Sequence, residues 1–150
     1  MGFMDKIGGN IVNGVLGNLS EVSVDELNNE YGWYIMSNET IQTGFKMVRD
    51  VMILTDKRII EFDKQGATGQ KMSVESINLD AIINVTAETS GFGADDSEIT
   101  ITYITSPYFK VSGGAAVSES KFEFPKNFDI KPLYKTLQEI AYKNHERING

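Results

Sequence analysis

The stretch VMILTDKRIIEFDKQG, residues 51–66, decides the fold of this chain. Two short apolar runs, 51–54 and 59–60, are separated only by Thr55-Asp56-Lys57-Arg58, residue types that favour a tight turn between strands. Lys64-Gln65-Gly66 then closes the next hairpin. A chain that reverses direction twice over so short a distance is typical of an antiparallel sheet.

The same two-residue period extends on both sides, from residue 39 to residue 124. No helical pattern interrupts it, so an antiparallel sandwich or barrel is indicated. The loops at 89–97 and 106–118 are polar and glycine-rich, and the second is long enough to form an extended arm. We predict strands near 41–48, 51–55, 58–63, 70–77, 81–88, 98–105 and 119–124.

Amphipathic helices are predicted on either side of the strands. Ser23-x-x-Glu26 forms a capping box, and the apolar positions that follow reach Ile35. The C-terminal helix begins near Asp129, with Pro132 in its first turn and an unbroken apolar stripe behind it. A stripe this wide has to lie on the sheet.

Composition excludes several classes of function. The chain has 150 residues, enough for one domain, and its net charge of −7 disfavours a broad nucleic-acid surface. It has no cysteine and one histidine, His145, which excludes disulfides, thiolate nucleophiles and multi-histidine metal sites. We expect no metal, no cofactor and no catalytic residue. No signal peptide or membrane-spanning run is found, so we expect a cytoplasmic protein.

Residues 1–19 form a separate glycine-rich, amphipathic segment before a domain at 20–150. An apolar residue recurs every four positions, at Phe3, Ile7, Ile11 and Val15. Each interior glycine costs about 1 kcal/mol relative to alanine, so this helix needs a surface on which to dock. Its own domain or a second subunit is favoured over a membrane surface, which would require more basic residues than Lys6. Peripheral membrane attachment through this segment is the second hypothesis.

Carboxylates provide a third, catalytic hypothesis. Glu61 and Asp63 share one face of a predicted strand and would suit the acid/base pair of a hydrolase. Any solvent-facing strand surface produces the same spacing, and we favour that interpretation. Asp95 and Asp96 lie in a glycine-rich loop that lacks the spacing of a Ca²⁺ site and the following helix of a phosphate loop.

Seven antiparallel strands followed by one amphipathic helix resemble a pleckstrin-homology (PH)-like barrel. The run TDKRIIEFDKQGATGQK, residues 55–71, resembles the signature hairpin of the bacterial PH-like family. Residues 45–50 and 82–89 also resemble that family, as does the glycine-rich segment that starts at Met1-Gly2. The resemblance covers residues 20–145, and only the N-terminal segment and the 106–118 arm are longer than it predicts.

The resemblance implies a mainly β fold with α: a seven-stranded antiparallel barrel or roll, capped by the C-terminal helix and preceded by N-terminal helices. It also implies homo-oligomeric rings, ligand clefts between subunits and no enzymatic activity. Relatives of the fold bind phosphoinositides through a basic loop. The residues of this chain most similar to that loop are Lys46, Arg49, Lys57 and Arg58. These four are ligand-binding candidates, although we favour a role as solvated edge and turn charges. The net charge argues against phosphoinositides.

We therefore expect a non-enzymatic, self-associating PH-like module that binds or scaffolds an unidentified partner. Trp33, the only tryptophan, is predicted to be a core or interface anchor. Tyr108 and Phe109 lie in the predicted arm, where an exposed aromatic pair favours an oligomer contact. The candidate interface residues are Phe3, Ile7, Ile11, Val15, Trp33, Tyr108 and Phe109.

Overall fold

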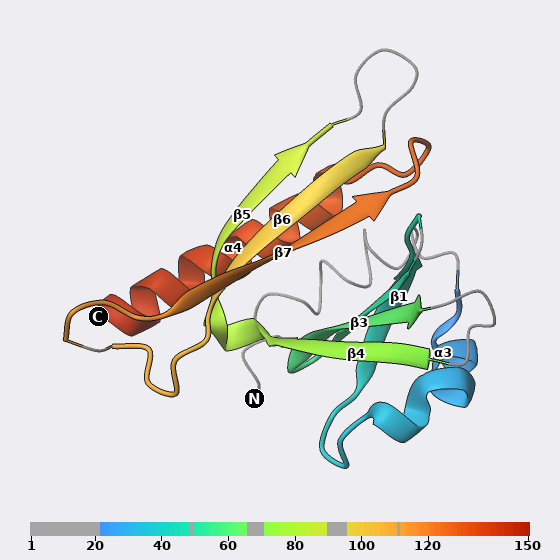
Figure 1. The fold of residues 1–150 in the computed structure, drawn as a ribbon, viewed down its shortest axis with the longest axis horizontal. Coiled ribbons are helices and arrows are strands. Elements are labelled where there is room, and N and C mark those ends of the chain that lie inside the picture. The colour runs from blue at the N-terminus through green and yellow to red at the C-terminus, as the bar shows by residue number, and fades with distance from the viewer. Residues whose placement is uncertain (1–21, 49, 66–70, 90–95, 111) are drawn as a thin grey trace. The chain divides into compact units, whose positions relative to one another are not determined.

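The structure is a computed structural model that describes residues 22–48, 50–65, 71–89, 96–110 and 112–150. The chain divides into two units, unit 1 (Met1–Ser76) and unit 2 (Ile77–Gly150). It is mainly β, with seven strands in two sheets and a C-terminal helix (Figure 1). The predicted fold class is confirmed.

The sheet of unit 1 has the strand order β1-β2-β3-β4. Its first three strands pair antiparallel, with Phe45 opposite Met52 and Ile53 opposite Ile60. The turn at 55–58 therefore joins two strands, as its residue types predict. The four strands are β1 (Ile41–Lys46), β2 (Val51–Thr55), β3 (Arg58–Gln65) and β4 (Lys71–Asn78), close to the predicted ranges.

Helix α3 (Val24–Tyr31) begins at Ser23, whose Oγ accepts the Glu26 amide at 3.2 Å, as the capping box predicts. Its buried residues Leu27 and Tyr31 pack on one face of the unit 1 sheet. Gly44 makes this close approach possible, because a Cβ there would lie 2.6 Å from Leu27 Cδ1. The cluster comprises Leu27, Tyr31, Ile41, Ile53, Ile60 and Phe62.

The sheet of unit 2 has the order β5-β6-β7, and both pairings are antiparallel. A short 3₁₀ turn, η3 (Leu79–Ala81), leads into β5 (Ile82–Glu88). β6 (Ser97–Ile104) and β7 (Val117–Phe124) follow, and β7 begins two residues before its predicted start at 119. The intervening arm continues this hairpin, because the Thr105 amide donates to Ala116 O at 2.9 Å.

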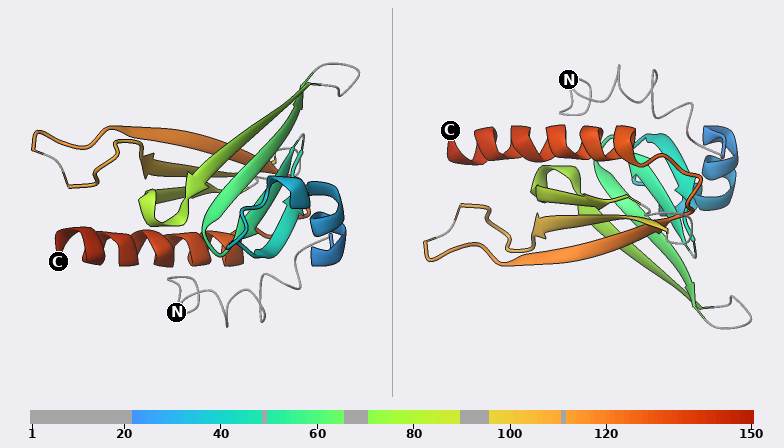
Figure 2. Two further views of the ribbon diagram at one scale, coloured as in Figure 1. Left: turned by 90° about the horizontal axis from the view of Figure 1, so that it is seen from below. Right: turned by 90° about the horizontal axis from the view of Figure 1, so that it is seen from above.

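Helix α4 (Lys131–Asn149) packs on β5 and buries Leu133, Leu137, Ile140 and Ala141. Figures 1 and 2 agree that it runs along the three strands of unit 2. The Asp129 carboxylate accepts the Lys131 amide at 3.1 Å, one residue earlier than a standard N-cap, which falls at Ile130. The predicted helix and its contact with a sheet are confirmed.

The last turns of α4 hold η3 in place through polar groups. The buried Asn144 side chain donates from Nδ2 to Leu79 O and to Ile82 O, both at 2.7 Å. Its Oδ1 accepts from Arg147 Nη2 at 3.0 Å, and the same nitrogen donates to Asp80 O. This arrangement, the Asn144 clamp, uses every hydrogen-bonding group of the amide.

Candidate functional site

The TDKR turn carries a second polar clamp, which we call the Arg58–Glu39 clamp. Arg58 Nε donates to Glu39 Oε2 at 2.8 Å and Nη2 donates to Oε1 at 2.9 Å, so the pairing is bidentate. The Glu39 side chain is fully buried and that of Arg58 is 13% exposed. Nη1 donates to Ser76 Oγ at 2.7 Å, which ties the turn to β4.

The neighbours of Glu39 keep its carboxylate charged. Burial by itself raises the pKa of Glu39, but hydrogen bonds from Arg58, Thr55 and the Met36 amide, together with the Arg58 charge, hold it below its ordinary value. Thr55 Oγ1 donates to Glu39 Oε2 at 2.6 Å and accepts the amides of Lys57 and Arg58. The clamp and the turn are therefore one hydrogen-bonded structure.

The same clamp holds a 3₁₀ turn, η2 (Gly32–Tyr34), that follows α3. Arg58 Nη2 donates to Tyr34 O at 2.6 Å. The Tyr34 ring packs edge-on against Phe62 of the core at 5.3 Å, and the Trp33 ring packs edge-on against Tyr34 at 5.1 Å. The three rings therefore form a chain of contacts that runs from buried Phe62 through Tyr34 to exposed Trp33.

Trp33 is 88% exposed, so the prediction that it could be a core residue is wrong. The reason is local: α3 ends at Tyr31, and the tighter 3₁₀ turn directs Tyr34 inward in its place. Met36, three residues further on, is also exposed. An exposed tryptophan on a rigid base has the properties of an interaction hot spot. The prediction that Trp33 is an interface anchor stays a prediction.

The four basic candidates do not gather at one place. Lys46 is opposite Val51 at one end of the β1–β2 pair, whereas Lys57 and Arg58 follow Thr55 at the other end. Lys46 and Lys57 are exposed. Arg49 lies outside the described residues. The Arg58 guanidinium already has four hydrogen bonds, so a ligand would have to displace Glu39, Ser76 or Tyr34.

Glu61 and Asp63 lie on β3 and are both half-buried, so the strand face that carries this pair is only partly open to solvent. Glu61 is opposite Met52, which is fully buried. Burial, a hydrogen bond with Asp50 and the charges of Asp50, Glu75 and Asp63 raise the pKa of Glu61 to about 7. The surroundings of Glu61 therefore favour the neutral form of its carboxyl group.

Unit 2 places the two aromatic residues of the arm in different environments. Tyr108 is 75% exposed, and its carbonyl accepts from Ser106 Oγ at 2.9 Å. Phe109 is half-buried, and its ring centroid lies 5.8 Å from the Arg147 guanidinium carbon of α4. Of the predicted exposed pair, only Tyr108 is fully available to a partner; its role as an interface residue stays a prediction.

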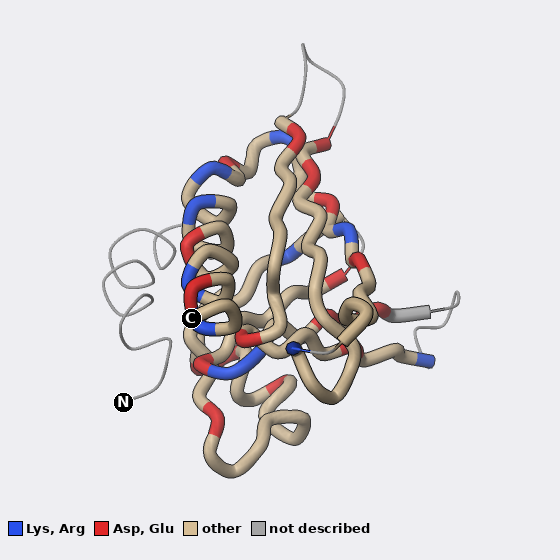
Figure 3. Tube along the Cα trace, turned by 90° about the vertical axis from the view of Figure 1, so that its left-hand side faces the viewer, with Lys and Arg blue, Asp and Glu red and all other residues tan. Residues whose placement is uncertain are grey.

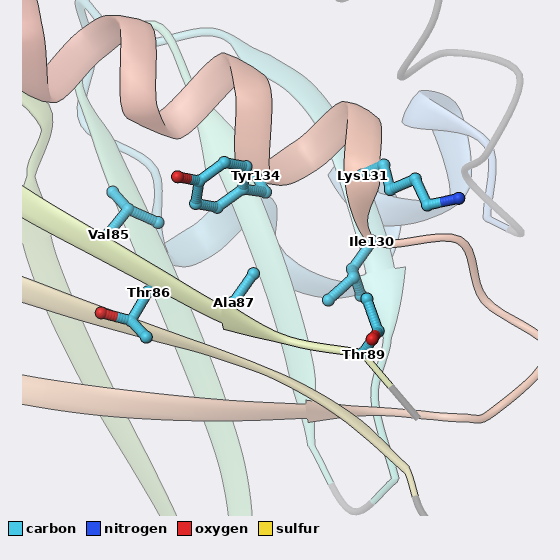
Figure 4. A pocket seen from close by; sticks show the side chains of 7 residues that line it. All are labelled: Val85, Thr86, Ala87, Thr89, Ile130, Lys131 and Tyr134. Atoms are coloured by element: carbon cyan, nitrogen blue, oxygen red, sulfur yellow. The ribbon is translucent and has the colours of Figure 1, made fainter. Parts of the chain in front are cut away.

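A cavity of about 390 Å³ lies between the start of α4 and the end of β5. We call it the α4/β5 cavity. Figure 4 shows Val85 and Ala87 pointing from β5 toward the helix, and Tyr134 lying along the helix with its hydroxyl toward Val85. Tyr134 makes no side-chain hydrogen bond within the described part of the chain. The lining residues are Val85, Thr86, Ala87, Thr89, Ile130, Lys131 and Tyr134.

Three residues of these sites were absent from the sequence-based candidates: Glu39, Asn144 and Tyr134. Glu39 and Asn144 look like ordinary polar residues, and only their contacts reveal them as buried. The clearest available signal is that Asn144 follows the apolar stripe of α4, three residues after Ala141, on the buried face. Nothing in the sequence indicates that Tyr134 borders a cavity.

Within the described ranges, no group of three or more acidic or histidine side chains is placed to hold a metal ion. No helix in the same ranges is long and apolar enough to cross a bilayer. The interface candidates Phe3, Ile7, Ile11 and Val15 lie outside the described residues, as do residues 66–70 of the hairpin motif and 90–95 of the glycine-rich loop.

A model of the bacterial PH domain matches residues 10–141. The chain belongs to the bacterial PH domain family. A relative from Bacillus subtilis (strain 168), named uncharacterized protein YjqA, is 34% identical over 141 residues, which cover 94% of this chain and 99% of that protein. The family predicted from the TDKR hairpin is confirmed.

Solved structures of bacterial PH domains also match this chain. A PH domain from Shewanella amazonensis SB2B is 33% identical, with a TM-score of 0.62 over 87% of this chain and 97% of that one. A DUF1696 family protein with a PH domain from Shewanella loihica PV-4 is 30% identical, with a TM-score of 0.58 over 81% and 96%. Both support the PH-like fold of this bacterial PH domain.

Proposed function

We propose that this bacterial PH domain is a non-enzymatic binding module that associates with itself and acts in the cytoplasm. The exposure of Trp33 is the observation that carries the proposal. Tryptophan is among the residues most enriched in the energetic centres of protein interfaces, and leaving it in water forfeits its large apolar contribution. A second copy is the partner that is always present.

The way in which Trp33 is supported favours an interface over an accidental exposure. Its base, Tyr34, is held on one side by Phe62 and at its carbonyl by Arg58. Side chains that are already ordered lose less conformational entropy on binding. The chain therefore supplies a pre-organised anchor, and much of the TDKR motif serves to hold it.

Light scattering on the purified full chain tests this proposal. At micromolar concentration we expect the wild type to have the mass of an oligomer and Trp33→Ala to shift toward the monomer. Tyr142→Ala is the matched control, because Tyr142 is also an exposed aromatic, 62% accessible, but lies on α4. It should assemble like the wild type. A monomeric wild type would contradict the proposal.

A deletion of residues 1–19 measures the other proposed contribution to assembly. These residues carry the apolar positions Phe3, Ile7, Ile11 and Val15. We expect the deletion to lower the oligomer mass or the solubility. An unchanged mass would remove this segment from the interface and leave Trp33 as the anchor.

A further inference from the structure

An exposed indole and a largely apolar cavity are found on different units of this chain. Trp33 belongs to unit 1, and the α4/β5 cavity belongs to unit 2. We propose that the cavity receives the Trp33 indole of a second copy. This inference rests on the self-association proposed above, and it adds the surface to which Trp33 binds.

The size of the cavity fits this occupant. Its volume of about 390 Å³ is at the small end of the roughly 300–1,000 Å³ typical of small-molecule pockets, the size class of a two-ring group. Val85, Ala87 and Ile130 give it apolar walls. Because 88% of Trp33 is exposed, the indole occupies no cavity of its own chain.

The polar groups of the cavity also suit an indole. The indole Nε1–H is a donor without an acceptor function, and it needs an acceptor when it is buried. Tyr134 lines the cavity, and Figure 4 shows its hydroxyl directed toward Val85; the hydroxyl has no partner within the described residues, so it can accept. Lys131 lies at the rim of the same cavity, where Figure 4 shows its side chain extending away from Val85 and Tyr134, and it adds a positive charge there.

The charge of α3 is complementary to that of the first two turns of α4, while exposed Glu88 and Asp129 lie next to lining residues of the cavity and carry the opposite sign. Helix α3, which leads into the Trp33 turn, carries exposed Asp25, Glu26 and Glu30 and no basic residue. The first two turns of α4 carry exposed Lys131 and Lys135 and no acidic residue, as the blue segments of that half of the helix show in Figure 3. Opposite charges facing each other fix the orientation of an encounter.

Contact between unlike surfaces has a consequence for the form of the assembly. Reciprocal insertion between two copies closes a symmetric dimer. If Trp33 of one copy enters the cavity of the next and the reverse contact does not form between the same two copies, each copy still has a free cavity or a free tryptophan. Such heterologous contacts build a closed ring when the rotation between copies closes and a filament when it does not. A contact of Trp33 with Trp33 would instead be symmetric and would end at a dimer.

Two full-length variants separate the two halves of the contact. Trp33→Ala removes the anchor and keeps the cavity, whereas Ala87→Phe fills the cavity and keeps the anchor. We expect each alone to dissociate, with a dissociation constant raised at least about thirtyfold, the loss typical of a hot-spot residue. Their equimolar mixture should form a 1:1 heterodimer and nothing larger, because each copy supplies the half that the other lacks. Sedimentation velocity measures all three.

The single tryptophan gives an independent readout in the wild type. Its emission should shift to shorter wavelength, and its quenching by acrylamide should fall, as the concentration rises. Neither change should occur in Ala87→Phe. If Ala87→Phe unfolds, Lys131→Glu at the exposed rim of the cavity tests the same contact. We expect it to weaken assembly at least tenfold, because it reverses one of the charges proposed to face α3 of the second copy.

The outcomes distinguish this inference from the proposed function. If Trp33→Ala dissociates while Ala87→Phe and Lys131→Glu assemble like the wild type, the cavity is not the receptor and self-association through Trp33 stands. If the mixture of Trp33→Ala and Ala87→Phe remains monomeric although both are folded, the head-to-tail contact is likewise refuted. A wild type that is monomeric removes both proposals.

Discussion

The two units of this domain each hold a short 3₁₀ turn with a buried polar side chain, but they use different chemistry. In unit 1 a charged pair, Arg58 and Glu39, holds η2; in unit 2 a neutral amide, Asn144, holds η3. The Asn144 amide donates to two backbone carbonyls and accepts from one donor, the Arg147 guanidinium. The guanidinium needs a carboxylate that is itself surrounded by donors.

This difference shows which turn depends on charge. Removing one partner of a buried ion pair leaves the other charge without compensation, which costs more than an unsatisfied amide or carbonyl. The charged clamp also holds the turn that carries Trp33. We infer that unit 1 uses the buried ion pair because the planar Arg58 guanidinium holds Glu39, Ser76 and Tyr34 at the same time.

Arg58→Met should have the largest effect on stability. It leaves the buried Glu39 carboxylate without its counter-charge, and we expect the free energy of unfolding to fall by about 3–5 kcal/mol. Arg58→Lys keeps the charge but loses the bidentate geometry of the guanidinium, so its free energy of unfolding should lie between those of Arg58→Met and the wild type. Urea denaturation measures all three. A loss smaller than that of Asn144→Ala would overturn the contrast between the two clamps.

Glu39→Leu combined with Arg58→Met sharpens the same contrast. The double variant contains neither buried charge, so we expect it to recover part of the stability that Arg58→Met loses. If the double variant is less stable than Arg58→Met alone, the penalty comes from the lost contacts to Tyr34 and Ser76, and the buried charge is not its cause.

Asn144→Ala should have an intermediate effect. It leaves Leu79 O and Ile82 O without the side-chain donor that they share, and we expect a loss of about 1–3 kcal/mol. Asn149→Ala is the matched control, because the exposed Asn149 side chain donates to His145 O, one turn back in its own helix. That variant should stay within about 0.5 kcal/mol of the wild type. Equal losses in the two variants would show that η3 does not need the clamp.

The pH dependence of stability should show the smallest effect, at most about 1 kcal/mol after solvent screening. Because the pKa of Glu61 is raised to about 7 in the folded state, its contribution is complete below pH 4.5 and is lost as the pH rises through 7. Glu39 acts in the opposite direction. Because its pKa is lowered in the folded state, its contribution to stability is present when the pH is above 4.5 and is lost as the pH falls through the folded-state pKa.

Glu61→Gln separates these two contributions. The variant keeps a neutral group at position 61, so its melting temperature should be flatter than that of the wild type between pH 4.5 and 7. The acid-side loss from Glu39 should remain. A decline toward neutral pH as steep as in the wild type would show that Glu61 is not its source.

Local patterns in the sequence predicted the architecture well. The alternation around 99–103 and the turn residues at 55–58 act between neighbours along the chain, so they fix strands without knowledge of the whole fold. The stripe of α4 is equally local. The family resemblance of the TDKR hairpin was also readable, because its residues are contiguous.

The candidate sites were less predictable because their partners are distant in sequence. Arg58 was identified as a turn charge, yet its carboxylate partner Glu39 comes nineteen residues earlier. The sequence predicts Trp33 in the core or at an interface, and one 3₁₀ turn leaves the side chain exposed and so excludes the core. The cavity depends on the small size of Ala87 opposite Tyr134, a relationship between two elements that no periodicity records.

The Asn144 clamp also has a consequence for biosynthesis. Its donor is translated 62 and 65 residues after the two carbonyls that it holds, so η3 and β5 leave the ribosome long before their clamp exists. Until Asn144 is in place, the entry into β5 lacks its side-chain donors and the apolar face of β5 lacks the cover of α4. Unit 2 can therefore be completed only after synthesis of the last turns of α4, and until then it exposes apolar surface of the kind that makes folding intermediates prone to aggregation.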